Sequence, residues 1–326
     1  MLIYTQRSVW LTLWASLIMN RFMGRIRHYY GAVYPMKKLL LVSSFLIIFV
    51  GCGPRLIYPH LDWLIPWYVG DYISLDDTQK NMLQKRLLKQ LDWHCATQLP
   101  TYAETLRAIG RDFASADQPI NYSKIQFHNK KLLQLWQELL KQIEPDINAI
   151  LITASDTQID EFFDNLAKQN QEFKEEYVDH PIQQLNENRQ KRIVKRLKYW
   201  ISNLTANQEA AVSSWSTELV PISEDWLRNR EKIQAEARRL LSQRSSRPEF
   251  RASLHELILN PEQMRTPAYQ AKIEANIDIT INFVIQLDRL LTPQQRSYLL
   301  KRIESLASDF DKLSCDPREV PKPRIN

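Results

Sequence analysis

Apolar residues recur every three to four positions over most of the chain, and this spacing is typical of amphipathic helices. Two clear apolar stripes are Leu83–Leu87–Leu88–Leu91–Cys95 and Leu299–Ile303–Leu306–Phe310. The same pattern predicts helices over 100–116, 121–143, 156–178, 182–203, 222–245 and 249–258. Segment 277–287 alternates as a strand does, but its apolar residues also share a helical face, and no second convincing strand is present to pair with it. We therefore expect a helix there.

Helix starts are marked by a recurring motif, in which a capping residue is followed three positions later by glutamine. In such a capping box the cap accepts the N–H of the glutamine, whose side chain accepts the N–H of the cap. Four copies preceded by leucine are LDDTQ at 75–79, LTANQ at 204–208, LNPEQ at 259–263 and LTPQQ at 291–295, and ASDTQ at 154–158 is a weaker copy. The expected caps are Asp76, Ser155, Thr205, Asn260 and Thr292. Beyond the caps no internal duplication is evident.

The distribution of glycine excludes several fold classes. The chain has six glycines, and none follows Gly110. Hairpins, phosphate-binding loops and nucleophile elbows use glycine for positive φ or for close backbone approach. We therefore expect an all-α fold, a multi-helix array or bundle, without a Rossmann, P-loop or α/β-hydrolase site.

Segment 36–51 has the pattern of an export signal. Lys37 and Lys38 precede an uncharged run from Leu39 to Val50, which is too short for a bilayer core that needs about 20 residues. The run ends in FVGC at 49–52, which resembles the bacterial lipobox, although leucine is preferred at the position of Phe49. The resemblance implies that Cys52 receives diacylglycerol, that the chain is cut before it, and that the new amine is acylated. A plain signal with an incidental cysteine, or a short anchor, is the alternative.

The charge balance changes once the signal is set aside. Residues 1–51 carry six basic residues and no acidic one, so the chain from Cys52 onward is formally neutral, and the net charge of +6 does not indicate a nucleic-acid partner. The simplest interpretation of residues 1–35 is an over-extended start with Met36 as the true initiator. A long basic region that is removed with the signal is the alternative.

The residue after the lipidation site bears on location. Gly53 follows Cys52, whereas an aspartate there tends to retain lipoproteins of Gram-negative bacteria in the inner membrane. We therefore expect an outer-membrane lipoprotein that faces the periplasm. Its expected parts are an aromatic membrane-proximal segment at 52–75, a helical periplasmic domain at 76–313 and an irregular, proline-rich tail at 314–326.

Aromatic residues crowd the segment RLIYPHLDWLIPWYVGDYISLDD at 55–77. Because Trp and Tyr favour membrane interfaces, we expect Trp63, Trp67, Tyr68 and Tyr72 to be possible contacts with a membrane or a partner. The alternative is a segment that folds onto the helical core. Together with LDWHC at 91–95 and LPTYAETLR at 99–107, this segment resembles an uncharacterised family of proteobacterial lipoproteins, described only as a domain of unknown function. The resemblance implies fold class and location, but no catalytic or ligand residue.

A basic cluster, RQKRIVKRLK at 189–198, lies opposite an apolar stripe. Such a helix can bind anionic lipid or another polyanion. The possible contacts are Arg189, Lys191, Arg192, Lys195, Arg196 and Lys198. The alternative is an ordinary solvated face, or a face that is paired internally with the acidic segment 160–179 as an antiparallel neighbour.

No catalytic or metal motif is evident. The histidines His60, His94, His128, His180 and His255 form no paired ligand motif, and HELIL at 255–259 lacks the second histidine of a zinc-protease signature. We therefore expect no metal, no cofactor and no enzymatic activity. A hydrolase with an unrecognised site is the alternative.

Two of the caps also resemble the LTxxQ signature of the Spy/CpxP periplasmic stress proteins, which are small helical cradles that hold unfolded clients or sense envelope stress. The matching residues are Leu204, Thr205, Gln208, Leu291, Thr292 and Gln295. We expect a lipid-anchored periplasmic binding or scaffold protein with an envelope protein as partner, and the resemblance offers a chaperone for unfolded clients as the alternative.

Only Cys95 and Cys315 are left once Cys52 is lipidated. Two thiols in an oxidising compartment are candidates for a disulfide. Such a bond would join the tail to the first long helix. Two unrelated buried thiols are the alternative.

Overall fold

The structure is a computed structural model that describes residues 54–115, 119–244 and 248–315, and all structural statements below refer to these ranges. Within them the chain forms helices and no strand, which confirms the all-α prediction. Segment 277–287 lies inside a helix, as expected. None of the described helices is long and apolar enough to cross a membrane. The signal at 36–51 and Cys52 lie outside the described residues.

The helices follow one another with short connections. Their order is α3 (Pro54–Ile57), the 3-10 turn η1 (Tyr58–His60), α4 (Leu61–Val69), α5 (Asp77–Trp93), the π-helical segment η2 (His94–Gln98), α6 (Leu99–Ala114), α7 (Tyr122–Leu151), α8 (Asp156–Tyr177), α9 (Ile182–Ile201), α10 (Ala206–Glu218), α11 (Ser223–Ser242), α12 (Pro248–Leu259), the 3-10 turn η3 (Pro261–Met264), α13 (Pro267–Arg289) and α14 (Pro293–Leu313).

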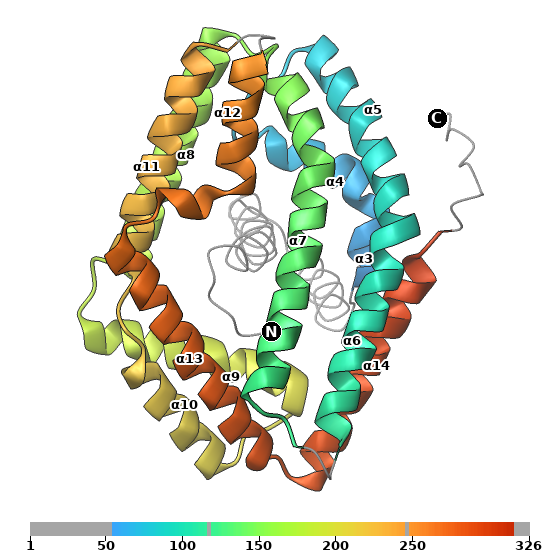
Figure 1. Cartoon of the computed structure of the whole chain (residues 1–326), viewed down its shortest axis with the longest axis vertical. Coiled ribbons are helices and arrows are strands. Elements are labelled where there is room, and N and C mark those ends of the chain that lie inside the picture. The colour runs from blue at the N-terminus through green and yellow to red at the C-terminus, as the bar shows by residue number, and fades with distance from the viewer. Residues whose placement is uncertain (1–53, 116–118, 245–247, 316–326) are drawn as a thin grey trace, which may run out of the picture.

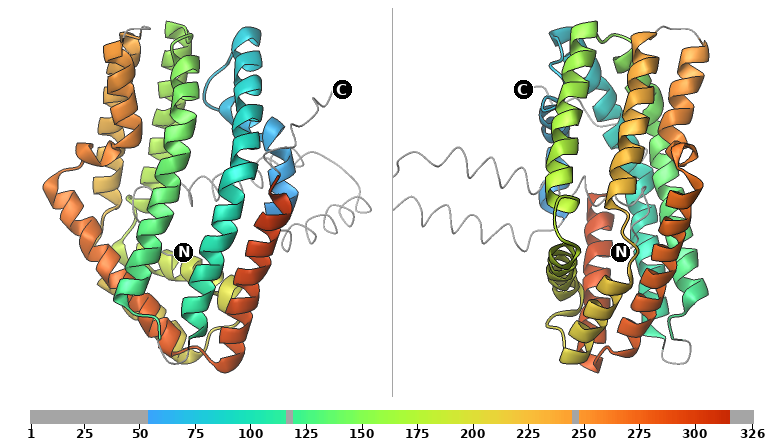
Figure 2. Two further views of the ribbon diagram at one scale, coloured as in Figure 1. Left: turned by 45° about the vertical axis from the view of Figure 1, so that its right-hand side comes forward. Right: turned by 90° about the vertical axis from the view of Figure 1, so that its left-hand side faces the viewer.

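The helices form an elongated frame rather than a parallel bundle (Figure 1). Helices α7, α12 and α13 lie on the near side in Figure 1, whereas α3, α4, α8 and α9 lie on the far side, and Figure 2 shows the same division from the edge. Helices α5, η2 and α6 run on as one rod along one edge, and α14 packs beside α6. Helix α8 packs against α11.

The described residues form four apolar cores, and the two largest are the following. The first core lies among α7, α8, α11 and α12, and its buried residues are Ile73, Ala154, Ile159, Phe163, Leu240, Leu241, Phe250 and Leu254. The second core lies among α9, α10, α13 and α14, and its buried residues are Ile193, Leu197, Ile201, Ala211, Val212, Trp215, Phe283, Leu287, Leu299 and Ile303. In both cores the buried side chains recur at helical spacing, as the apolar pattern predicts.

Four of the five expected capping boxes form, and they form in pairs. Asp76 caps α5 and Ser155 caps α8, each with its glutamine at the third helical position. Gln79 donates from Nε2 to the carbonyl of Thr153 at 3.0 Å, and Gln158 donates to the carbonyl of Ser74 at 2.7 Å. The two amides also bond to each other. We call these two caps and their glutamines the first cap pair.

The caps of α10 and α14 repeat this arrangement. Thr205 and Thr292 cap the two helices, while Gln208 donates to the carbonyl of Leu290 and Gln295 donates to that of Asn203. The two glutamines bond to each other, as in the first pair. In all four cases the accepting carbonyl lies two residues before the partner's cap. This second cap pair lies at the opposite end of the long axis, where α10 and α14 begin (Figure 1).

Two expectations about helix boundaries are wrong. Asn260 makes no capping bond, because its ψ of 48° is not the extended value of a cap, and its side chain and that of Gln263 both donate to Glu256. Helix α13 is capped instead by Thr266, which accepts the N–H of Tyr269. Helix α7 does not end near 143 but continues through Pro145 to Leu151.

Candidate functional site

The aromatic segment divides into an exposed and a buried side. Leu56, His60, Trp63 and Trp67 are all exposed, and their positions follow helical spacing through α3, η1 and α4. Trp63 has 53% of its surface exposed, against 37% for Trp67. The opposite side packs against α5 and α14. We call these four residues the outer stripe.

Of the four aromatic residues singled out in this segment, one is buried and one is partly buried. Tyr68 is buried, and its hydroxyl lies 2.8 Å from that of Tyr72, which donates to Gln169 on α8 at 3.0 Å. The structure therefore places Trp63 and Trp67 outside, and it places Tyr68 and Tyr72 in an internal polar network. The helical spacing of Leu56 and His60 with the two tryptophans was the signal that could have identified the rest of the stripe.

Tyr58 holds the segment on the helical frame. Its hydroxyl lies 3.0 Å from Nδ1 of His94 and 3.4 Å from the carbonyl oxygen of Leu91, and its ring stacks on that of His94. Burial lowers the pKa of His94 to about 4, so the imidazole is neutral at physiological pH. Burial also raises the pKa of Tyr58 and that of the neighbouring Tyr102, the latter to about 12. The contact between Tyr58 and His94 therefore joins two neutral groups, and its role is to pack the segment against the helical frame.

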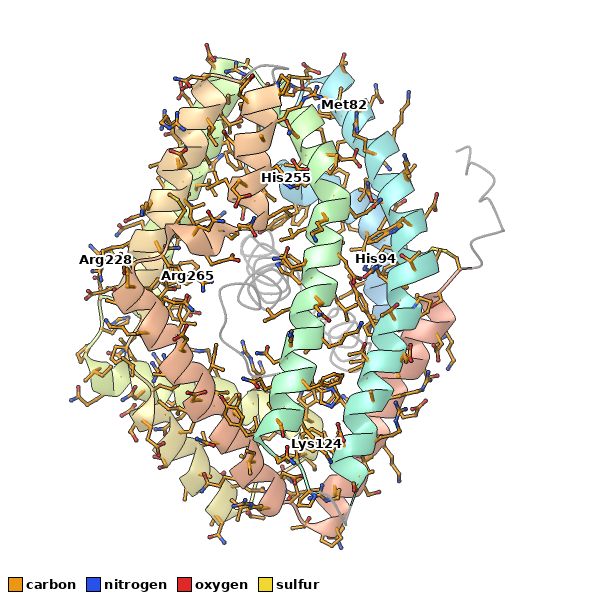
Figure 3. All side chains as sticks on the ribbon, viewed as in Figure 1. Met82, His94, Lys124, Arg228, His255 and Arg265 are labelled. Carbon is orange, nitrogen blue, oxygen red and sulfur yellow. A yellow bond between two sulfur atoms is a disulfide. The ribbon has the colours of Figure 1, made fainter. Side chains whose placement is uncertain are left out.

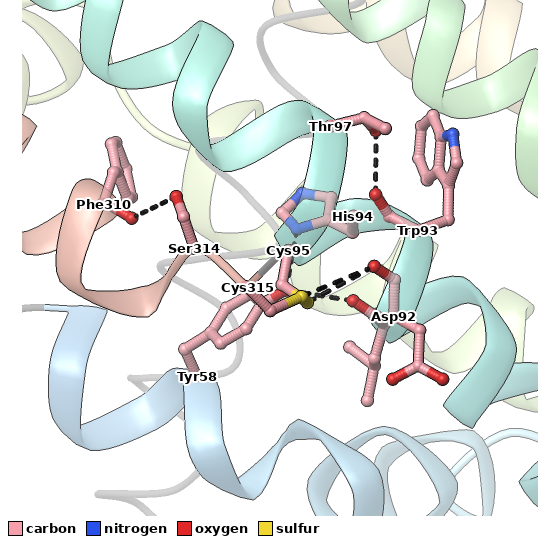
Figure 4. Close-up of a disulfide and its surroundings, with 10 residues drawn as sticks. Tyr58, Asp92, Trp93, His94, Cys95, Thr97, Phe310, Ser314 and Cys315 are labelled. Carbon is pink, nitrogen blue, oxygen red and sulfur yellow. Dashed lines mark hydrogen bonds between the residues drawn. A yellow bond between two sulfur atoms is a disulfide. The ribbon is translucent and has the colours of Figure 1, made fainter. Parts of the chain in front are cut away.

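A disulfide lies directly beside this contact (Figure 4). Cys95 and Cys315 are bonded, with their α-carbons 5.4 Å apart, so the structure contains the pairing that the sequence led us to expect. Cys95 belongs to the π-helical segment η2, and the backbone N–H of Cys315 donates to its carbonyl at 3.3 Å. π-Helical turns are rare and often mark functional positions. Here the turn presents His94 and Cys95 to the two ends of the described chain.

The basic cluster occupies the exposed surface of α9. Ile193, Leu197 and Ile201 face the second core. Of the six basic residues, Lys191, Lys195, Arg196 and Lys198 are exposed and have no carboxylate partner among the described residues. The other two have neighbours: Arg192 lies over the ring of Tyr177, and Arg189 donates to the carbonyl of Ser216.

The alternative in which the acidic segment 160–179 neutralises this cluster as an antiparallel neighbour is wrong. Helix α8, which carries that segment, packs against α11 rather than α9. Its ion pair from Asp160 goes to Arg238 on α11. Apolar contacts in the first core decide the neighbour of α8, and the charges of α9 stay exposed to solvent.

The other ionisable groups are dispersed. His128 on α7 bonds to Asp112 at 2.6 Å, and Lys124 forms an ion pair with the same carboxylate at 3.2 Å. Burial would raise the pKa of Asp112, but the hydrogen bonds from His128 and Lys124 outweigh it and lower that pKa. His255 on α12 lies 3.2 Å from Glu144. Figure 3 shows His94, Lys124 and His255 well apart on different helices.

These groups offer few starting points for chemistry. No cluster of three or more His, Cys, Asp or Glu side chains suited to a metal occurs in the described ranges. A pocket with a volume of about 360 Å³ lies where η3 meets α13, and its lining residues are Glu262, Gln263, Arg265, Thr266, Pro267 and Gln270. This lining contains no histidine, cysteine or serine.

One comparison with known proteins gives a match. A family model described as a family of unknown function (DUF6279) matches residues 71–270. The match begins just after α4 and ends near the start of α13, so it contains three of the four paired caps and the whole of α9. No curated protein and no solved structure matches the chain.

Proposed function

The chain belongs to the DUF6279 family, whose function is unknown, and we propose that it is a lipid-anchored helical protein of the outer membrane that acts in the periplasm by binding or scaffolding rather than by catalysis. The observation that carries the proposal is the position of Cys52. A lipobox-like sequence ends at this residue, and the first described helix begins at Pro54, so the proposed lipid would sit next to the folded domain.

Two features of the structure support this proposal. The Cys95–Cys315 disulfide suits an oxidising compartment. The glutamine side chains at the paired helix starts bond to each other, so these polar groups serve the architecture of the domain. A binding or scaffold role asks for a frame that is held together and has an exposed surface, and the disulfide and the bonded caps hold this frame together.

The anchor is tested by mass spectrometry of the protein purified from membranes. We expect the mature chain to begin at an acylated Cys52. The variant Cys52→Ala should lack the acyl mass and should leave the membrane fraction or retain its signal. Gly53→Ala is the matched control and should be acylated normally. An intact 1–326 chain with an unmodified Cys52 would contradict the anchor.

A chaperone role is the second candidate, and helix α7 carries the observation that favours it. Phe127 is 66% exposed, and Tyr122 and Leu132 on the same helix are also exposed. An exposed apolar surface can hold unfolded segments of a client. The protein should then suppress aggregation of an unfolded client without ATP, and Phe127→Ser should weaken the suppression. If the protein does not slow aggregation at a stoichiometric ratio, the chaperone role is contradicted and the scaffold role remains.

A further inference from the structure

Helices α3, α4 and α9 lie on the far side of the molecule in Figure 1, and they carry exposed residues that suit a membrane surface. The outer stripe runs through α3, η1 and α4, and the basic surface lies on α9. Both α3 and α9 pack against α14, which therefore holds the two features in a fixed relation. Figure 2 shows α3, α4 and α9 on one side and α7, α12 and α13 on the other.

We propose that this side, formed by α3, α4 and the C-terminal half of α9, is the surface with which the protein lies on an anionic phospholipid bilayer. The proposal rests on the lipid anchor at Cys52 and adds an orientation to it. An acyl chain alone would leave the domain free to turn, whereas two contacts beside the anchor would hold one side of the frame against the lipid.

The apolar contact comes from the outer stripe. Leu56 of the stripe and its neighbour Ile57 are 40% and 41% exposed, and they lie within five residues of Cys52. Trp63 follows two turns later, and an indole ring favours the boundary between lipid tails and water. Exposed apolar side chains are common on soluble proteins, but these form one stripe at the end of the chain that would carry the lipid.

The electrostatic contact comes from α9. Lys195 and Lys198 lie on its exposed surface, and Arg196 lies beside them. Arg302 of α14 adds a further cation there, because its guanidinium lies 4.0 Å from the centre of the Tyr199 ring and its Nε donates to the Tyr199 carbonyl. A basic side chain near an anionic bilayer contributes about 1 kcal/mol of attraction.

Charge also limits how far the contact extends. The C-terminal part of α8 is acidic and carries Glu172, Glu175 and Glu176, and this part precedes the N-terminal end of α9. An anionic bilayer would repel these carboxylates. The contact should therefore include the end of α9 that packs on α14 and exclude the end of α8.

The test measures access of water to single positions in the lipid-bearing protein. Cysteine replaces His60 on the outer stripe or, as the matched reporter, Gln126, which is exposed on α7 at the other side. Each variant is reconstituted into vesicles of phosphatidylcholine, with or without phosphatidylglycerol. An impermeant maleimide is added, and each rate is divided by that of the same variant unfolded in urea.

With phosphatidylglycerol, the normalised rate at position 60 should be about tenfold lower than at position 126, the factor that corresponds to 1.4 kcal/mol. In phosphatidylcholine alone, or at high salt, the protection should be smaller. A third reporter, Glu176→Cys, should react as fast as the one at position 126. Equal rates at 60 and 126 with the anionic lipid would overturn the proposal.

Two matched pairs of variants separate the contributions. Lys195→Gln with Lys198→Gln should abolish the part of the protection that depends on phosphatidylglycerol, whereas Lys130→Gln with Lys141→Gln on α7 should not change it. Trp63→Ser should reduce protection in both lipids, and Phe127→Ser should not. If all four variants leave the protection unchanged, the surface proposed here is wrong.

The acyl mass on Cys52, measured in the same preparation, distinguishes failure of the lipid anchor from failure of the proposed surface. If that mass is absent, the lipid anchor is contradicted, and the rates after mixing with vesicles decide the orientation alone. Protection at position 60 would then support the surface without the anchor, and its absence would overturn the surface as well.

Discussion

The first and second cap pairs contain the same hydrogen bonds in different surroundings. In the second pair Gln208 is completely buried and Gln295 is 6% exposed. In the first pair Gln79 is equally buried, but Gln158 is partly exposed and Thr153 adds a hydroxyl contact. A bond broken in the second pair leaves groups that water cannot reach, whereas water can replace part of the first. The comparison predicts that the same motif contributes more to the free energy of unfolding in the second pair than in the first.

The disulfide connects the ends of two helices that begin at the two cap pairs. Its loss should have the largest effect on the free energy of unfolding. Helix α5 starts at the first pair and leads to Cys95, while α14 starts at the second and leads to Cys315. In the chain-entropy model a bond that spans 220 residues contributes at most about 5 kcal/mol. Cys95→Ser with Cys315→Ser should lower the free energy of unfolding by about 3–5 kcal/mol in urea titrations.

That prediction has a built-in control. The unaltered protein measured under reducing conditions should unfold like the serine variant, and under oxidising conditions the two should differ. If the variant and the oxidised protein unfold at the same urea concentration, the bond does not couple the two ends.

Gln208→Ala should have the next largest effect. It leaves the Leu290 carbonyl and the amide of Gln295 without their partner in a buried site, and each such group costs about 1–3 kcal/mol. We expect a loss of about 3 kcal/mol by calorimetry or urea titration. Adding Gln295→Ala should cost less than the sum of the two single changes, because both remove the same network. Strict additivity would show that the two amides do not act together.

The region between the two pairs should respond to pH through His94. Its pKa of about 4 in the folded protein lies below the ordinary value of 6.5, so the unfolded chain takes up a proton first as the pH falls. The contribution of His94 to the free energy of unfolding therefore stays constant above pH 6.5 and falls as the pH decreases from 6.5 to 4. At pH 5 the free energy of unfolding should be lower by about 2 kcal/mol. Urea titrations at pH 7.5 and 5 measure this loss, and His94→Gln should remove that part of the difference.

Gln158→Ala should have the smallest effect of the four. Water can reach the partly exposed site, so the loss should be about 1 kcal/mol. The same urea titration measures it beside Gln208→Ala. A loss equal to that of Gln208→Ala would break the comparison, because burial would then not set the energetic weight of the pair.

Local features of the fold could be predicted from the sequence, and contacts between distant residues could not. The apolar spacing predicted the helices, and the capping-box motif predicted the caps at Asp76, Ser155, Thr205 and Thr292. Asn260 failed as a cap because its backbone is not extended, with a ψ of 48°, and its side-chain amide donates instead to Glu256 one turn earlier. A capping box says nothing of its partner, so a bond such as Gln208–Gln295, between residues 87 apart, could not be predicted.

The candidate site shows the same limit. The alternative pairing of 160–179 with 189–198 relied on opposite charge, yet the apolar faces of α8 and α11 decided the contact. Composition alone could not separate Trp63 from Tyr68 in the aromatic segment, although helical spacing could have done so. The disulfide could be predicted because only two cysteines follow Cys52, so there was no choice between partners.

The disulfide also fixes how the domain would carry a mechanical load. A force pulling the two ends of the chain apart would act on α3, α4 and α5 up to Cys95, and then pass through the sulfur–sulfur bond to Cys315. Residues 96–314 would lie outside that path and could not be drawn out while the bond holds. A molecule tethered at one end and pulled at the other would thus have a short, fixed extension, and reduction of one bond would release the full length of the frame.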